Sequence, residues 1–193
     1  FLTIRNIDNS SLITKTLDER IGVRRDFIIE NNNHLVDAGY QIYGTSGQPF
    51  NMEGNSQLTL GDSDDGTSFP LNYANADVDL ASATTITYNG GVAQDVRRLS
   101  SGTSNQNYAN LIFQNVGGSL VDKTLMALPV TADASDNVTI RGSLQILSNN
   151  HVIDDGYQIV GTGGQTFEME SSSQLTIGNA TVATVFPQNY LDT

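Results

Sequence analysis

Cysteine and tryptophan are both absent from this chain of 193 residues. Without cysteine the chain forms no disulfide and no metal site with thiolate ligands. The absence does not place the protein in the cytosol, because stacked repeats bury enough apolar surface to fold without disulfides.

Basic residues and long apolar runs are also scarce. Nine Lys and Arg stand against 21 Asp and Glu, which gives a formal net charge of -12. Nucleic-acid binding needs cations that displace condensed counterions, so we expect no nucleic-acid partner. No apolar run approaches the roughly 18 residues needed to cross a bilayer, so we expect no membrane insertion in this segment. The polarity comes from Asn, Ser, Thr, Gln and Gly, which is typical of an extracellular β-rich protein.

What the sequence has in abundance is self-similarity. Residues 31–73 return as residues 148–190 at an offset of 117, and 25 of the 43 paired positions are identical. Residues 11–17 resemble residues 119–125 at an offset of 108, so the second copy holds nine extra residues, which we expect within residues 129–137. We therefore divide the chain into unit one (residues 1–109) and unit two (residues 110–193), which is incomplete and continuous with the first. Because the chain opens without Met, we expect an internal piece of a longer protein.

Short strands with Gly, Asn or Ser corners dominate the local pattern, and helix signals are few. A second, shorter period separates Phe27 from Phe50, Leu35 from Leu58 and Phe50 from Tyr73. We predict an all-β fold, a right-handed parallel β-helix (β-solenoid) with coils of about 23 residues in repeats of about 117 residues. Each repeat would then hold about five coils, and the chain about eight. A string of β-sandwich domains is the alternative fold.

Four stretches carry a resemblance to a known family: residues 85–94, 108–113, 138–146 and 161–178. The first contains Tyr-Asn-Gly followed by Ala-Gln, and the second contains Tyr-x-Asn-Leu before an apolar strand. These stretches resemble the repeats of giant surface proteins of Bacteroidota, similar to the large gliding-motility adhesin exported by type IX secretion. The resemblance covers most of residues 80–180 and the matching part of the first copy. It implies a cell-surface location, an extended shape and an adhesive or stalk-like function, with no catalytic residues to carry over.

The two histidines occupy equivalent positions in the two copies. His34 precedes Asp37 by three residues, as His151 precedes Asp154. A metal site normally needs three or more ligands, and the chain has no other histidine. We therefore predict structural histidines at a corner, bonded to Asp or Asn.

Clustered charges suggest three further sites, and each is better explained as surface structure. Residues 62–66 (Asp-Ser-Asp-Asp-Gly) have the composition of a small calcium loop, but not the EF-hand spacing, so we interpret them as an acidic turn. We expect no cofactor, with Ca²⁺ at this turn as the alternative. Glu53 and Glu170 lie too far apart to form the carboxylate pair of a glycosidase. The arginine pairs at 24–25 and 97–98 are expected to balance local charge on loops.

We therefore assign no catalytic, cofactor-binding or metal-binding residues and expect a protein that is not an enzyme. The predicted function is a structural or adhesive repeat segment of a large bacterial cell-surface adhesin or extracellular filament. Such a segment acts as an extended stalk or binding array, outside the cell. Its expected partners are neighbouring repeats or identical subunits, and surface polysaccharide. The alternative is a β-helix lyase or hydrolase acting on polysaccharides, or a tailspike-like carbohydrate-binding protein.

Overall fold

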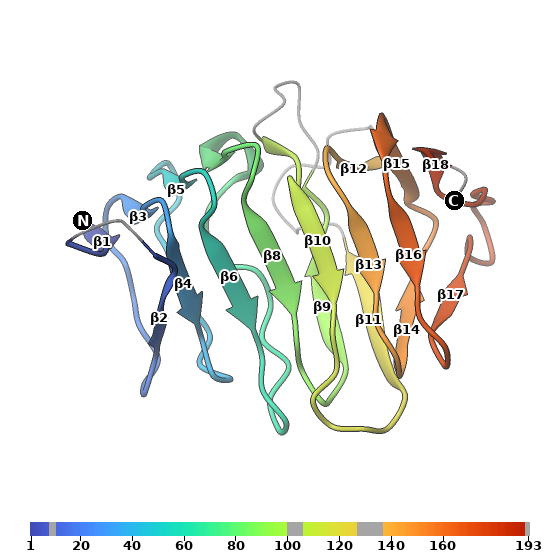
Figure 1. Cartoon of the computed structure of the whole chain (residues 1–193), viewed down its shortest axis with the longest axis horizontal. Coiled ribbons are helices and arrows are strands. Elements are labelled where there is room, and N and C mark those ends of the chain that lie inside the picture. The colour runs from blue at the N-terminus through green and yellow to red at the C-terminus, as the bar shows by residue number, and fades with distance from the viewer. Residues whose placement is uncertain (8–10, 100–105, 127–136, 192–193) are drawn as a thin grey trace.

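The computed structural model describes residues 1–7, 11–99, 106–126 and 137–191. It is an all-β solenoid of about 7 turns with a spacing of about 25 residues, so the predicted fold class is confirmed. The turns stack along the longest axis, and the two termini lie at opposite ends (Figure 1). All described strand pairs are parallel, which excludes the antiparallel β-sandwich alternative.

Each turn visits three sides of the solenoid in the same order. Side one consists of β1 (Leu2–Ile4), β3 (Phe27–Ile29), β5 (Phe50–Met52) and β7 (Val78–Leu80), then β12 (Asn137–Ile140), β15 (Gln158–Gln165) and β18 (Gln188–Tyr190). Side two is one sheet of β2 (Ile13–Thr16), β4 (Asn33–Val36), β6 (Gln57–Leu60), β8 (Thr85–Tyr88), β10 (Asn110–Phe113), β13 (Leu144–Ile146) and β16 (Phe167–Met169).

Side three begins with single-residue bridges from Gly22 to Tyr43 and from Tyr43 to Leu71. It continues as β9 (Gln94–Arg97), β11 (Val121–Met126), β14 (Asn150–Ile153) and β17 (Gln174–Thr176). A 3-10 turn, η1 (Asn75–Asp77), precedes β7. Within the described ranges, no helix is long and apolar enough to span a bilayer.

The short period predicted from the sequence is present in some turns but not in all. Phe27 pairs in register with Phe50, as the period predicts, and the equivalent strands β13 and β16 repeat this step. Phe50, however, pairs with Val78 rather than with Tyr73, because a loop that leaves the strand ladder follows β6. The average spacing is therefore about 25 residues, and the chain makes about 7 turns rather than eight.

The nine extra residues of unit two lengthen a single turn. Ile13 pairs with Asn33 at a sequence offset of 20, whereas the equivalent pair, Val121 and Asn150, has an offset of 29. The offset between paired residues of β12 and β15 returns to 21, the same as that between Gly22 and Tyr43. The insertion thus lies between β11 and β12, as predicted, although residues 129–136 lie outside the described residues.

The two units lie one side apart around the solenoid axis. β10 is the equivalent of β1, because it pairs with β13 as β1 pairs with β3, yet β1 is on side one and β10 on side two. In the same way β4 is on side two and its equivalent β14 on side three. We call each strand or single-residue bridge on a side of the solenoid a strand position. From β1 up to, but not including, β10 the chain passes through thirteen strand positions: β1, β2, Gly22, β3, β4, Tyr43, β5, β6, Leu71, β7, β8, β9 and Tyr108. With three positions a turn, a unit spans four turns and one side, so the expected five coils were too many.

Inward side chains of successive turns stack into one continuous apolar core. The fully buried row of side two consists of Leu35, Leu58, Ile86, Leu111 and Leu144, which pair in register from strand to strand. This row crosses the boundary between the units without a break. Each turn covers the core of its neighbour, so units extend the solenoid without needing a core of their own.

Candidate functional site

One candidate surface is an outward row of hydrogen-bonded side chains on side two. Strand alternation places Leu35 in the core and His34 of β4 outside. His34 lies between two threonines, with Nδ1 3.3 Å from Thr14 Oγ1 and Nε2 2.8 Å from Thr59 Oγ1. Partial burial lowers the pKa of His34, so the ring is neutral at pH 7 and donates from one nitrogen while accepting at the other. We call Thr14, His34 and Thr59 the His34 row.

Unit two repeats this row with one substitution. His151 Nδ1 lies 2.9 Å from Asp122 Oδ1, and its Nε2 lies 2.7 Å from Thr176 Oγ1. We call Asp122, His151 and Thr176 the His151 row; Asp122 replaces the threonine of the first row. The prediction that a histidine bonds Asp is confirmed for His151 and wrong for His34, and both lie within strands rather than at corners.

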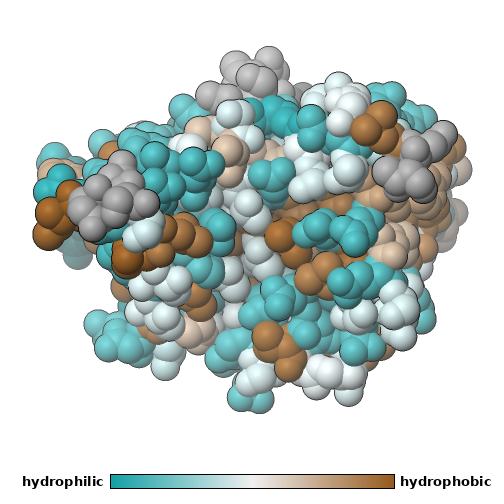
Figure 2. Space-filling view, in the orientation of Figure 1, coloured by the Kyte–Doolittle hydropathy of each residue, from teal (hydrophilic) through white to brown (hydrophobic). Residues whose placement is uncertain are grey.

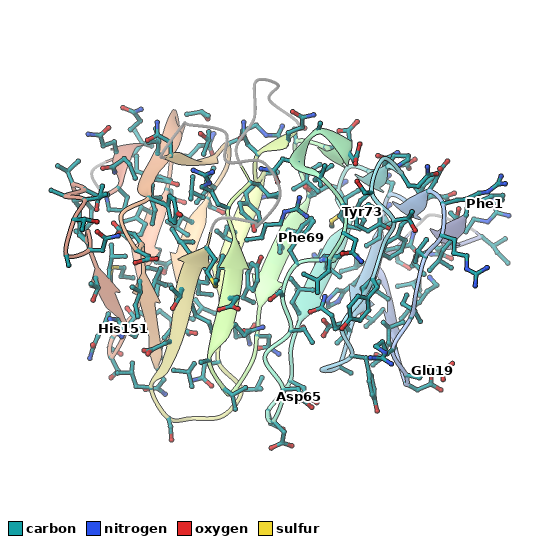
Figure 3. All side chains as sticks on the ribbon, turned by 180° about the vertical axis from the view of Figure 1, so that it is seen from behind. Phe1, Glu19, Asp65, Phe69, Tyr73 and His151 are labelled. Atoms are coloured by element: carbon teal, nitrogen blue, oxygen red, sulfur yellow. The ribbon has the colours of Figure 1, made fainter. Side chains whose placement is uncertain are left out.

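Unit two is shifted by one side around the solenoid axis relative to unit one, so the two rows face different directions. The His34 row lies on β2, β4 and β6 of side two, and the His151 row on β11, β14 and β17 of side three. Figure 3 shows His151 toward the end of the molecule opposite Phe1. The repeated surface therefore faces two directions around the axis rather than one flat face.

The aspartates that follow the histidines are buried and do not contact them. Asp37 Oδ1 accepts hydrogen bonds from Gly39 N (3.1 Å) and Gly61 N (2.7 Å), and its other oxygen accepts one from the Thr67 hydroxyl. Asp154 makes the same three contacts with the equivalent residues: Gly156, Gly178 and Thr184. Burial outweighs these donors and raises the pKa of Asp37 to about 6. These carboxylates fasten the loop after β6 and its copy to the preceding turn.

The acidic turn after β6 is built by backbone capping. Asp62 Oδ1 accepts from Asp64 N (2.9 Å) and Asp65 N (2.8 Å). In unit two the neutral Asn179 makes the equivalent two bonds. The amide oxygen of Asn179 accepts the same two hydrogen bonds as the carboxylate of Asp62. The negative charge of Asp62 is therefore not needed to form this turn. In the described part of the chain, no three His, Asp or Glu residues come together as a metal site.

The two glutamates also cap backbone. Glu53 Oε2 accepts from Asn31 N at 3.3 Å, and Glu170 Oε2 accepts from Ser148 N at 2.9 Å. They follow β5 on side one and β16 on side two, so they do not share a surface.

The arginine pairs differ from each other. Arg24 and Arg25 are exposed, whereas Arg97 and Arg98 are buried, so the expectation of a charged loop is wrong for the second pair. Arg97 Cζ lies 5.1 Å from the centre of the Phe69 ring, and its guanidinium donates to Tyr73 O at 2.6 Å. It joins the turn that ends at Tyr73 to the next one.

Sequence reasoning missed a polar network inside the solenoid near the unit boundary. Lys123 Nζ donates to Gly90 O at 2.7 Å and to Gln94 Oε1, and Lys123 has no exposed surface. Burial lowers the pKa of Lys123 to about 7. The hydroxyls of Tyr88 and Tyr108 lie 2.9 Å apart in the same region. The signal was in the alternation of β11, where Lys123 occupies an inward position between two buried apolar residues.

No protein-family model, no curated protein and no solved structure matches the chain. The stacked parallel turns and the internal duplication define its class, a β-solenoid repeat protein. The chemistry on its surface is hydrogen bonding from imidazole and hydroxyl groups, presented once in each unit, with a carboxylate added in unit two.

Proposed function

We propose that this chain is a segment of an extended extracellular fibre or cell-surface adhesin, which spaces and repeats a polar binding surface. The observation that carries the proposal is the seven-stranded sheet of side two, which runs through both units. β8 of unit one pairs with β10 of unit two through four residue pairs, so the units form one rod rather than two hinged domains. Such a rod grows by adding units, as a stalk requires.

Its cellular context in this proposal is the surface of a bacterium, with a repetitive adhesin of the Bacteroidota gliding-motility type as the specific form. Residues 85–94 and 108–113, which carry that resemblance, form the strands and corners on both sides of the unit boundary. The net charge of -12 disfavours anionic partners such as nucleic acid. Neighbouring repeats and a neutral surface polysaccharide are the proposed partners.

Binding belongs to the two histidine rows in this proposal. Sugar hydroxyls need groups that both donate and accept. Both nitrogens of each imidazole are bonded within its row, so the threonine hydroxyls that they orient provide the remaining hydrogen-bonding capacity. Two rows on one rigid rod bind a polysaccharide multivalently, and the loss of one row then costs far more than half of the binding.

The test is binding of the purified chain to a panel of immobilised neutral polysaccharides. We expect His34→Ala and His151→Ala each to weaken retention about tenfold or more, and the double variant to abolish it. Gln114→Ala, an exposed change outside both rows, is the matched control and should bind like the parent chain. Retention of every polysaccharide by the double variant would refute the assignment of binding to the rows.

A second function, hydrolysis, is favoured by one specific arrangement. Asp122, His151 and Thr176 are hydrogen-bonded in the order acid, base and hydroxyl used by catalytic triads. Thr176→Ala should then remove hydrolysis of a small ester substrate, whereas Thr59→Ala, in the row without the aspartate, should leave it unchanged. Activity that survives Thr176→Ala would exclude this site.

A further inference from the structure

The middle turns of the solenoid enclose a lysine and a glutamine side chain in direct contact. Lys123 of β11 pairs in register with Gln94 of β9, across the boundary between the units. Because β11 pairs with β9 on one edge and with β14 on the other, this turn has both of its neighbours. Lys123 is 0% exposed and Gln94 is 2% exposed. Side chains of mixed hydropathy close the face of side two over β8 and β10 in Figure 2. The pair is therefore shielded from water.

The carboxamide of Gln94 is held in one orientation. Its nitrogen donates to two backbone carbonyls, one of them Thr67 O at 2.8 Å, and its oxygen accepts from Gly90 N at 2.7 Å. A Cβ added to Gly61, Gly66 or Gly90 would lie 2.7–2.8 Å from an atom of this side chain. The three glycines thus leave room for the carboxamide and keep its oxygen turned toward the lysine.

The amine of Lys123 lies against this carboxamide without a counter-ion in the contact. Its Nζ donates to Gly90 O at 2.7 Å and to Gln94 Oε1, and both acceptors are uncharged. Burial lowers the pKa of Lys123 to about 7. About half of the molecules then carry a neutral amine at pH 7, whereas a lysine in water is almost fully protonated. A neutral amine is a nucleophile, and here it lies beside a carbonyl carbon.

A carboxyl group lies one residue away from the nitrogen of the same carboxamide. Gly61 N donates to Asp37 Oδ1 at 2.7 Å, and the Thr67 hydroxyl donates to the other oxygen of Asp37. The same two residues lie against Gln94 Nε2, because Thr67 O accepts from it and Gly61 packs on it. Asp37 thus reaches the carboxamide nitrogen through Thr67 and is a positioning residue for a proton in transit.

We propose that Lys123 and Gln94 form an intramolecular amide (isopeptide) bond after the chain has folded. The lone pair of the neutral amine forms a bond with Cδ of Gln94, which is bonded to the oxygen that Nζ already contacts. The carbonyl electrons move onto Oε1, where Gly90 N–H stabilises the negative charge. The Cδ–Nε2 bond then breaks. The proton lost by Nζ passes through Asp37 and Thr67 to Nε2, which leaves as ammonia, so the step needs no oxidant, reductant or co-reactant.

The bond would join the two units covalently. It connects β9 of unit one to β11 of unit two and closes residues 94–123 into a loop. The resulting amide nitrogen does not titrate near pH 7, so the pKa of Lys123 describes the chain before the bond forms. The bond goes beyond the proposed function, and only its purpose, reinforcement of a rod under tension, rests on that function.

The test is the intact mass of the purified 193-residue chain, fresh and after prolonged incubation at pH 8. We expect the incubated chain to be lighter by about 17 Da, the mass of ammonia, and trypsin to release peptides joined through Lys123 and Gln94. Lys123→Met and Gln94→Met should keep their full mass, with far-UV circular dichroism as the check of folding. Lys15 is the matched control, because it contacts the carboxamide of Asn33 at 2.7 Å but is only partly buried. Lys15→Met should lose ammonia like the parent.

The pH profile of the reaction tests the proton path. Asp37→Asn should form the bond about tenfold more slowly or worse at pH 7, whereas Asp154→Asn, the equivalent change in unit two, should react like the parent. The pKa of Asp37 is about 6, so its ionisation contributes to the rate only in the parent. Between pH 5 and 7 the parent rate should therefore rise about tenfold more than that of Asp37→Asn.

Three results would overturn the inference. These are a parent chain that keeps its full mass after incubation, an ammonia loss that survives Lys123→Met, and a loss confined to the Asn89–Gly90 peptide, where succinimide formation releases the same mass. An uncross-linked parent that still binds polysaccharide through its histidine rows would leave the proposed function standing. A cross-linked chain that binds none would leave the bond standing, so the two failures are distinguishable.

Discussion

Individual buried side chains connect the turns of this solenoid. Two of them, Asp37 and Lys123, have pKa values within the pH range over which unfolding can be measured. Asp37 joins β4 to the loop after β6 through Gly39, Gly61 and Thr67. Its pKa of about 6 lies above the unfolded value of roughly 3.9, so the folded chain binds the proton more tightly. The stability that this protonation contributes is present below about pH 4 and is lost as the pH rises through about 6.

Asp37→Asn should remove this pH dependence. The amide oxygen keeps the two glycine donors and the amide nitrogen donates to Thr67, so the variant stays folded. Urea unfolding between pH 4 and 6.5 should show the free energy of unfolding of the parent falling relative to that of the variant. Parallel profiles for the two proteins would contradict the assignment. Asp37→Ala leaves three donors without an acceptor and should cost about 3 kcal/mol.

Lys123 produces a pH dependence of the opposite sign. Its pKa of about 7 lies below the unfolded value of roughly 10.4, so the unfolded chain binds more protons between these values. The free energy of unfolding should therefore rise with pH from about 7 to 9.5, and Lys123→Met should flatten this rise. Lys15→Met is the matched control, because Lys15 is the equivalent residue and is only partly buried. Equal slopes in Lys123→Met and the parent would show that another group titrates.

At the scale of elements, the corner before β5 depends on a close approach between turns. A Cβ added to Gly44 would lie 2.2 Å from the buried Tyr73 ring, whereas one added to the equivalent Gly161 would lie 3.0 Å from Tyr190. We expect Gly44→Ala to destabilise the chain by about 2–4 kcal/mol, because the ring is enclosed and cannot move aside. Gly161→Ala should cost less than about 1 kcal/mol, because Tyr190 is only partly buried and the approach is less close. Chemical unfolding of both variants measures the difference, and similar losses would refute this account of the corner.

The elements that sequence predicted well are those that repeat. The step from Phe27 to Phe50 needs only matching side chains at matching intervals, and the structure pairs these residues. The pairing of Phe50 with Val78 was not predicted, because the loops outside the strand ladder vary in length from turn to turn. The partners of His34 and Asp37 were missed for a related reason. Thr14, Thr59 and Thr67 are distant in sequence and become neighbours only once the register of the turns is known.

At the scale of the whole molecule, the one-side step between units sets the symmetry of any longer array. A unit of four turns and one side shifts its copy to the next side, so three units, or thirteen turns, bring a residue back to its starting side. At about 4.8 Å per turn, one unit rises about 21 Å and the true repeat is about 62 Å. Fibres of the native full-length protein should therefore show a strong axial spacing at this longer repeat by cryo-electron microscopy. A true repeat at a single unit would mean that further units are shorter by one strand position or longer by two. With the step preserved, histidine rows face all three sides in succession, so a fibre binds partners around its whole circumference.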